Sequence, residues 1–382
     1  MVPSANSLPP STYILLKLAS TCNLACTYCY WFRDPSVRKR PSLLALEVEN
    51  AFLRKLESHI TGYGLNSYFI LFHGGEPLLF GKKRFKALCE KILTLATKVD
   101  CKIKLSVTTN GTLLDAEWVN LFKHYEVSPT LSIDSTAKSH DERRIDLRGR
   151  GSFQKVMRAL ETLRENGVEP GILSVFDPEV DPAKAISHIT ETLKIKSFDI
   201  LIPDATHDDE VVAPIAEAYI AMFDSWRSRS ENEGYDFRLC RNIVSALVGL
   251  DSSSESVGLA PVTTSTLLTD GSLEPLDILR IAGDGHTATA YNIFDHDLDD
   301  VRKSPLWEEV YMSSITLPAP CRSCEFMEAC GGGLIANRWS KTKRYDNPSV
   351  YCSDLKAIYR HAKNVIAQST YLEYGANGTE VS

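Results

Sequence analysis

Apolar and polar residues follow two different spacings over the first half of the chain. Short apolar runs such as Tyr13–Leu18 predict buried strands, and longer segments with apolar residues three or four positions apart predict amphipathic helices. The predicted strands are Tyr13–Leu18, Tyr68–His73, Lys102–Thr109, Thr130–Asp134, Gly171–Phe176 and Phe198–Ile202. The predicted helices are Leu43–Ile60, Lys82–Lys98, Asp115–Tyr125, a helix that starts at Ser152, and Ala183–Leu193.

This alternation predicts an α/β fold. Strand–helix repeats with right-handed crossovers form a parallel sheet, here curled into a partial (β/α)6 barrel. In such a fold the functional side chains collect at the carboxyl ends of the strands. The segments that follow each predicted strand are therefore the first places to look for chemistry.

The pattern changes after a predicted helix over Ala216–Ser230. Asp251–Ser256 is typical of a linker, and Thr264–Asp277 predicts a hairpin that turns at Asp270-Gly271. A loop-rich, cysteine-bearing region and a final helix near Ser353–Gln368 follow. The expected organisation is an extension over 1–12, a barrel over 13–235, a helical bridge and linker over 236–256, a loop-rich domain with its C-terminal helix over 257–372, and a flexible tail over 373–382.

Composition narrows the class of protein. With 43% hydrophobic and 24% charged residues, the 382-residue chain is able to bury a large core. A net charge of -7 argues against nucleic acid as a partner. No apolar run reaches the roughly 18 residues of a transmembrane helix, and the first residues do not resemble a signal peptide. We expect a cytoplasmic protein with no membrane partner.

The ten cysteines fall into groups. Cys89, Cys101 and Cys240 are isolated and expected in the core. Disulfides are rare in the cytosol, so clustered cysteines there usually bind metal. The two clusters are Cys22, Cys26 and Cys29, and Cys321, Cys324, Cys330 and Cys352.

The first cluster, Cys-x3-Cys-x2-Cys, follows the first predicted strand. A structural zinc site needs a fourth Cys or His, and the local loop has none. A four-iron cluster held by three thiolates is the alternative, and it leaves one iron open.

This spacing, at this place in the fold, resembles the radical SAM superfamily. The resemblance implies that the open iron chelates the amino and carboxylate groups of S-adenosylmethionine (SAM). One electron from the cluster then cleaves the S–C5′ bond, and the 5′-deoxyadenosyl radical abstracts a substrate hydrogen. Flavodoxin or ferredoxin is the expected reductant.

Further segments match motifs of this family in order. His73-Gly-Gly-Glu-Pro77 resembles its GGEP motif, Thr109-Asn-Gly111 its TNG segment, and Ser132-Ile-Asp134 with His140-Asp-x-x-Arg144 its SIDG and HDxxR elements, although Ser135 replaces the usual Gly. The resemblance implies that Gly74 and Gly75 allow close backbone approach and that Glu76 receives the SAM ammonium. It implies that Asn110 lies beside the methionyl and ribose groups, that Ser132 contacts ribose or carboxylate, and that Arg144 pairs with the SAM carboxylate. Tyr28 would pack on adenine, unless it is a core aromatic.

The second cluster supplies four thiolates, which complete either a structural zinc site or a closed iron–sulfur cluster. Spacing alone does not decide between them. The arrangement resembles the SPASM extension of peptide-modifying radical SAM enzymes, which implies an auxiliary four-iron cluster. The full SPASM pattern has three more cysteines, but Leu276 and Leu334 occupy two of those places and no cysteine precedes Gly271 nearby. We expect two [4Fe-4S] clusters in total, one for SAM and one auxiliary.

Local segments resemble one SPASM subgroup, the three-residue-cyclophane-forming (FxsB-like and GrrM-like) maturases. They are Phe198–Asp208, Thr269–Asp277, Cys330–Gly333 and Asp346–Cys352. The resemblance implies a ribosomal precursor peptide as substrate. An aromatic ring carbon would be joined to the β-carbon of a residue two positions away. An extended substrate could pair with the hairpin near Gly271.

The last steps of such a reaction remove one electron and one proton. The auxiliary cluster is a plausible electron acceptor, and Asp204, His207 and Asp208 are candidate bases, unless they form only a solvated turn. The alternative functions are another radical SAM peptide oxidation (thioether, ether or formylglycine formation) and a non-catalytic, metal-binding peptide-binding protein.

Overall fold

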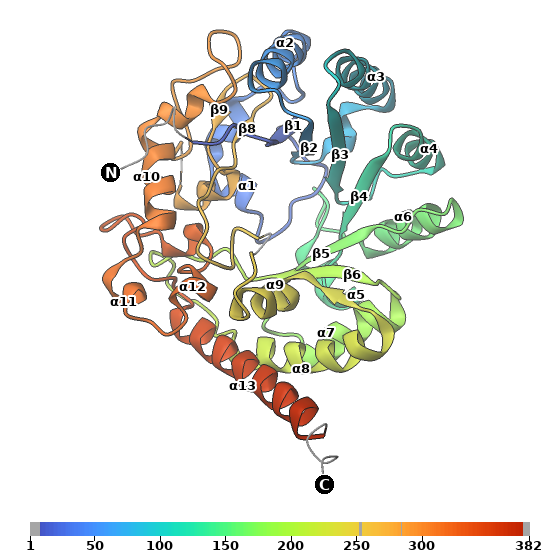
Figure 1. The fold of residues 1–382 in the computed structure, drawn as a ribbon. Helices are drawn as coiled ribbons and strands as arrows, with labels where there is room; N and C mark the ends of the chain where they lie inside the picture. The colour runs from blue at the N-terminus through green and yellow to red at the C-terminus, as the bar shows by residue number, and fades with distance from the viewer. Residues whose placement is uncertain (1–7, 252–253, 284, 377–382) are drawn as a thin grey trace. The chain divides into compact units, whose positions relative to one another are not determined.

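The computed structural model describes residues 8–251, 254–283 and 285–376 (Figure 1). Its elements fall into two units, and neither unit is continuous in sequence. The first unit combines Met1–Leu173 with Val262–Tyr311, and the second combines Ser174–Pro261 with Met312–Ser382. Each unit is therefore assembled from two separate stretches of the chain.

The first unit contains a mostly parallel sheet in the order β5-β4-β3-β2-β1-β8-β9. Its central strands are buried because apolar side chains meet across them, as Leu16 beside Phe72 and Phe72 beside Val107. Only the pair β8–β9 is antiparallel among the strands that the structure gives this unit. The strands are β1 Tyr13–Ala19, β2 Ser67–Gly74, β3 Lys102–Thr109, β4 Val127–Ser132, β5 Gly171–Val175, β8 Thr266–Leu267 and β9 Leu273–Glu274.

Helices α2, α3, α4 and α6 of the first unit lie along the outer side of these strands (Figure 1). Their ends follow from local chemistry: Asp115 caps the α4 helix by accepting from the Trp118 N–H, and Gly64 ends α2 in the left-handed region. The helices are α1 Tyr30–Arg33, α2 Leu46–Tyr63, α3 Lys82–Lys98, α4 Ala116–His124, α5 Ala137–Arg143, α6 Phe153–Glu165 and α10 Pro305–Ile315, with 3-10 turns η2 Pro35–Lys39, η3 Pro77–Phe80, η5 Asp277–Ala282 and η6 Asp300–Lys303.

The hairpin predicted at Asp270-Gly271 is confirmed, and Gly271 has the positive φ of 91° that this turn needs. The sequence also suggested that an extended substrate could pair with this hairpin, but the structure leaves no open edge for it at residues 271–273. Residues of the same chain cover that edge, because the Leu273 N–H donates to Tyr291 O (2.9 Å) and the Ile293 N–H donates to Gly271 O (2.8 Å).

The second unit holds the parallel pair β6 and β7, and the Phe176 N–H after β5 donates to Leu201 O (3.0 Å) at the end of β6. Helix α13 packs against α8 and α9. Its Asp354 accepts from the Ile215 and Ala216 N–H groups at the start of α8. The elements are β6 Ser197–Leu201, β7 Asp236–Phe237, α7 Pro182–Ser187, η4 His188–Thr192, α8 Ala216–Glu233, α9 Arg238–Leu247, α11 Ala319–Arg322, α12 Met327–Cys330, η7 Ile335–Arg338 and α13 Cys352–Ala376.

The boundaries differ from the predictions at several points. Strand β4 starts at Val127, ahead of the predicted Thr130, because Pro129 fits the parallel ladder beside Val107. Helix α13 continues to Ala376, into the predicted tail, whose residues 377–382 lie outside the described part. The isolated cysteines Cys89, Cys101 and Cys240 are buried as predicted. No helix within the described residues is long and apolar enough to cross a membrane.

Candidate active site and cofactor centres

The first cysteine group lies on the loop after β1. Two backbone hydrogen bonds hold this loop against the end of α5: the Ala25 N–H donates to Ile145 O (2.7 Å) and the Thr27 N–H donates to Arg143 O (2.9 Å). Cys22 Sγ accepts from the Leu24 N–H at 3.4 Å. The three thiols are partly exposed, so the loop presents three sulfur donors from one fixed backbone.

The thiols of this loop suit a metal centre better than a set of free cysteines. Burial raises the pKa of Cys22 to about 12, with the Glu76 carboxylate adding to the shift, and burial raises the pKa of Cys26 to about 11. Thiolates form at such sites when metal replaces the protons. Three sulfurs with a fourth position left open match the donor set of a substrate-binding four-iron cluster.

The Gly-Gly pair after β2 lies directly against this loop. A Cβ on Gly74 would overlap Ala19 O, and one on Gly75 would overlap Thr21 O. The Gly75 N–H also donates to Ala19 O at 2.9 Å. Glycine is therefore required at both places by the chain's own backbone, and the contacts of both residues with SAM stay predictions.

Glu76 is fully buried where β2 and β3 end. Its carboxylate accepts from the Leu78 N–H (2.9 Å), the Thr109 hydroxyl (2.7 Å) and the Asn110 N–H (2.8 Å). Burial raises the pKa of Glu76 to about 7, although these hydrogen bonds favour the ionised form. The group therefore changes its charge near neutral pH.

Glu76→Gln tests the expected contact with the SAM ammonium. A carboxylate with a pKa of about 7 is about one-tenth ionised at pH 6 and about nine-tenths ionised at pH 8. We expect the affinity ratio of wild type to variant, measured by equilibrium dialysis of labelled SAM on reconstituted protein, to grow about tenfold over this range. The ratio cancels the titration of SAM itself. Equal iron content is the control, and a ratio independent of pH would contradict the contact.

Asn110 and Ser132 lie after β3 and at the end of β4. The Asn110 side-chain amide donates to Asn23 Oδ1 (2.9 Å) and to Cys22 Sγ (3.7 Å). Ser132 is half-buried. Asn110 thus touches the cysteine loop itself, a contact that the sequence did not predict, and the roles of both residues toward SAM stay predictions.

Arg144 and Tyr28 meet at Asp134. The Tyr28 hydroxyl donates to Asp134 Oδ2 (2.8 Å), and Arg144 Nη2 donates to Asp134 Oδ1 (3.1 Å). The Arg143 guanidinium lies 4.3 Å from the centre of the Tyr28 ring. Arg144 Nε is buried and has no hydrogen-bond partner in the described part of the chain. A buried donor without an acceptor fits a site that receives an anionic ligand group, such as a carboxylate.

A buried charged group that sequence reasoning missed lies where β1, β2 and η5 meet. The Lys17 ammonium contacts Asp277 Oδ2 and lies 3.0 Å from His73 Nδ1. The Tyr30 hydroxyl donates to the same Asp277 oxygen at 2.7 Å. One available signal was the single charged residue, Lys17, within the apolar strand YILLKLA.

The charges of this group are fixed by their surroundings. Burial opposes ionisation of Asp277, but the adjacent Lys17 ammonium holds the pKa of the carboxyl well below its usual value. Burial and the same ammonium lower the pKa of His73 to about 3, so the imidazole is neutral. The result is an ionised carboxylate in contact with Tyr30, the residue that follows the third cysteine.

The predicted bases Asp204, His207 and Asp208 lie together in the loop after β6. His207 Nε2 donates to Pro348 O (2.8 Å), and Asp208 accepts from the Lys341 N–H (3.0 Å). These bonds connect the loop to residues 341–348 and give both side chains a structural task. Their assignment as bases stays a prediction.

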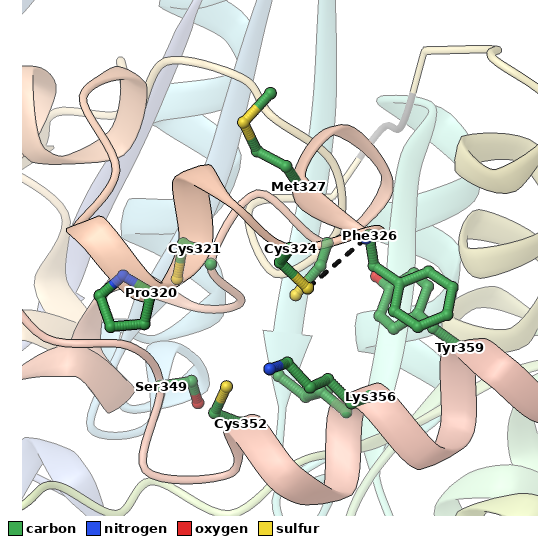
Figure 2. A pocket seen from close by; sticks show the side chains of 12 residues that line it. Pro320, Cys321, Cys324, Phe326, Met327, Ser349, Cys352, Lys356 and Tyr359 are labelled. Atoms are coloured by element: carbon green, nitrogen blue, oxygen red, sulfur yellow. Dashed lines mark hydrogen bonds between the residues drawn. The ribbon is translucent and has the colours of Figure 1, made fainter.

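The second cysteine group lines one pocket of the second unit (Figure 2). Cys321 comes from α11, Cys330 from α12 and Cys352 from the start of α13, and Cys324 lies between the first two. Phe326 N–H donates to Cys324 Sγ at 3.5 Å. No three of the His, Cys, Asp and Glu side chains that the structure describes surround a position for a single metal ion.

The backbone after Cys330 is shaped by three successive glycines. Gly331, Gly332 and Gly333 have φ values of 60°, 84° and 72°. A Cβ on Gly331 would overlap Gly258 O, so this turn requires glycine. Four thiols around one pocket, with no other protein ligand needed, fit the donor set of a closed iron–sulfur cluster.

Comparison with known proteins agrees with this architecture. A model of the Radical SAM superfamily matches residues 16–218. A cysteine-type anaerobic sulfatase-maturating enzyme of Clostridium novyi is 25% identical over 95% of this chain and 97% of its own length. A serine-type enzyme of the same description from Bacteroides thetaiotaomicron is also 25% identical, over 86% of this chain and 84% of its own length.

Solved structures confirm the predicted α/β fold class. The structure of histidine-tagged anSMEcpe with bound AdoMet superposes with a TM-score of 0.79 and 23% identity, covering 94% of this chain and 98% of that one. Native anSMEcpe with bound AdoMet and Cp18Cys peptide gives a TM-score of 0.78 over 94% of this chain and 99% of that one, again with 23% identity.

Proposed function

The chain belongs to the radical SAM superfamily, and on that premise we propose that it oxidises a side-chain carbon of a peptide substrate. Membership makes it an enzyme that uses SAM and a [4Fe-4S] cluster, as the sequence predicted. When bound, these cofactors supply abstraction of a hydrogen atom from an unactivated C–H bond. The similarity over nearly the full length to a cysteine-type sulfatase-maturating enzyme is the observation that carries the proposal.

The first candidate reaction is formylglycine formation. The β-carbon of a Cys or Ser in the peptide loses a hydrogen atom, then one electron and one proton. Ser gives the aldehyde directly, whereas Cys gives a thioaldehyde that water hydrolyses to the aldehyde with release of hydrogen sulfide. This was an alternative at the level of sequence. The comparisons give no support to the cyclophane crosslink that the sequence resemblance put first, because both relatives are sulfatase-maturating enzymes.

A C–C crosslink is the second candidate, and the observation that favours it is the cysteine-free segment around Leu276, one of the segments in which the sequence resembles the crosslinking subgroup. Leu276 is 4% exposed and packs in the core at a position where the full SPASM pattern has a cysteine. With Leu334 at another such position, the residues for a second auxiliary cluster are missing. The two candidates share the first hydrogen abstraction and differ in what happens to the oxidised carbon.

The residues of this chain take separate tasks in either reaction. We assign Cys22, Cys26 and Cys29 as ligands of the SAM-binding cluster and Cys321, Cys324, Cys330 and Cys352 as ligands of an auxiliary cluster. Glu76 and Arg144 would hold the ammonium and the carboxylate of SAM, since one is a buried acceptor and the other a buried donor without a partner.

Asp277 is our candidate for the proton acceptor. Its carboxylate is buried and ionised, and it lies beside Tyr30, the residue that follows Cys29. Lys17 fixes its charge and position. Its place next to the SAM-binding cysteine loop, and its ionised state, put it in a position to take up the proton that the reaction releases.

Asp277→Asn separates proton transfer from SAM cleavage. We expect 5′-deoxyadenosine release to persist and peptide product to fall by about 100-fold or more. Both are measured by chromatography and mass spectrometry after anaerobic reaction with reductant. Asp297→Asn, which alters an exposed carboxylate paired with Lys55, is the matched control.

The same assay compares the other candidate bases. If His207→Ala or Asp208→Asn loses product while Asp277→Asn keeps it, the assignment of Asp277 is wrong. Thermal melting and iron content verify each variant, because Asp277→Asn leaves the buried Lys17 without its charge partner.

Product analysis decides between the two candidate reactions. The enzyme is co-expressed with a candidate peptide that contains Cys, Ser and aromatic residues, and the product is examined by tandem mass spectrometry. An aldehyde reacts with hydroxylamine, whereas a crosslink loses two hydrogens, does not react, and resists fragmentation between the joined residues. An unmodified peptide despite SAM cleavage would count against both for that peptide class.

A further inference from the structure

Two cations lie at or near the pocket of the four cysteines: Lys356 lines it, and the guanidinium of Arg338 lies next to Gly332, a residue of its wall. Arg338 lies in η7 and is 1% exposed, and Lys356 lies on α13 one turn after Cys352. Among the residues that the structure describes, neither makes an ion pair with a carboxylate.

Arg338 is a buried positive charge that is solvated only by backbone. Its guanidinium donates to Asn347 O (2.9 Å), Ser313 O (2.7 Å) and Tyr345 O (2.8 Å). Asp346, a carboxylate whose charge acts on Arg338, is exposed. Burial of a cation without a counter-charge is costly, so a negative group is expected close by. The groups that could carry that charge are Cys321 and Cys330.

Lys356 is the second of these cations. Its side chain lines the pocket, and its ammonium points toward the space between Cys324 and Cys352 (Figure 2). The residue is half-buried, so its charge is less screened than that of a surface lysine. On the same helix, Lys363 points to Glu325 instead, at 3.5 Å.

We propose that Arg338 and Lys356 are the counter-charges of the auxiliary cluster and raise its one-electron reduction potential. This inference rests on the auxiliary cluster of the proposed function. Net charge, hydrogen bonds to sulfur and solvent exposure set the potentials of iron–sulfur clusters. A cation near the thiolates stabilises the reduced cluster, because reduction adds negative charge to it. Arg338 also holds the loop of residues 345–347, so Lys356 is the residue to vary.

The test uses the full chain carrying Cys22→Ala, Cys26→Ala and Cys29→Ala, so that only the auxiliary cluster is loaded. Lys356→Gln, Lys356→Arg and the control Lys363→Gln are introduced into this background. After anaerobic reconstitution, the cluster is titrated with reductant, and its reduced form is followed by electron paramagnetic resonance.

We expect Lys356→Gln to lower the ratio of reduced to oxidised cluster about tenfold at a fixed potential, which is about 59 mV. Lys356→Arg keeps the charge and should stay close to the parent, and Lys363→Gln should shift the ratio far less. A shift for Lys356→Gln no larger than that for Lys363→Gln overturns this inference alone. Absence of iron in the parent overturns the auxiliary cluster as well.

Discussion

Cys22→Ala, Cys26→Ala and Cys29→Ala are each expected to abolish the release of 5′-deoxyadenosine from SAM. The three sulfurs are the donors presented by the loop after β1, and a cluster with two thiolates has no stable place there. The measurement is 5′-deoxyadenosine by chromatography after anaerobic reaction with SAM and dithionite.

Iron content shows whether the loss has this cause. Each variant should bind about 4 Fe where the wild type binds about 8, because the auxiliary cluster remains. Cys89→Ala, which alters a buried core cysteine on α3, is the matched control and should keep both values. A variant of the triplet that still releases 5′-deoxyadenosine would refute the ligand assignment.

Cys330→Ala is expected to impair formation of the peptide product but not cleavage of SAM. SAM cleavage should persist, whereas modified peptide should fall by about 100-fold or more, because the oxidised substrate loses its electron acceptor. The iron content should again fall from about 8 to about 4 per chain. Both products are quantified in the same reaction by mass spectrometry.

A zinc site would give a different result. If the wild type contains zinc together with about 4 Fe, the second cysteine group is structural, as the sequence alone also allowed. Cys240→Ala, in the core of α9, is the control for loss of a thiol in the same unit. If the Cys330→Ala variant forms as much product as the wild type, the auxiliary cluster has no role in the reaction.

Sequence patterns were sufficient for the architecture because most of the six strands are short apolar or alternating runs between amphipathic helices. The six strands of the repeat were expected close to their observed positions, and the fold class is confirmed. Two short elements were not predicted from the sequence: strand β7, which has two residues, and helix α1, which is a single turn after Cys29. Their conformation depends on tertiary contacts, such as Trp31 Nε1 donating to Ser20 O.

The candidate site was predictable where chemistry is local in sequence. The cysteine spacing and the Gly-Gly-Glu turn point to their tasks directly. Asp277 and Lys17 did not, because they lie 260 positions apart and only the fold brings them into contact. Product identity was also beyond the sequence motifs, since the first steps of crosslinking and aldehyde formation place the same demands on the protein.

The backbone bonds that hold the first cysteine loop have a consequence for biosynthesis. Ala25 and Thr27 donate to Ile145 and Arg143, which the ribosome delivers only after four strands and the α5 helix have been made. The loop cannot take its final shape on the nascent chain before that point. Iron delivery to this loop is therefore expected to follow synthesis and folding of the chain at least as far as Ile145.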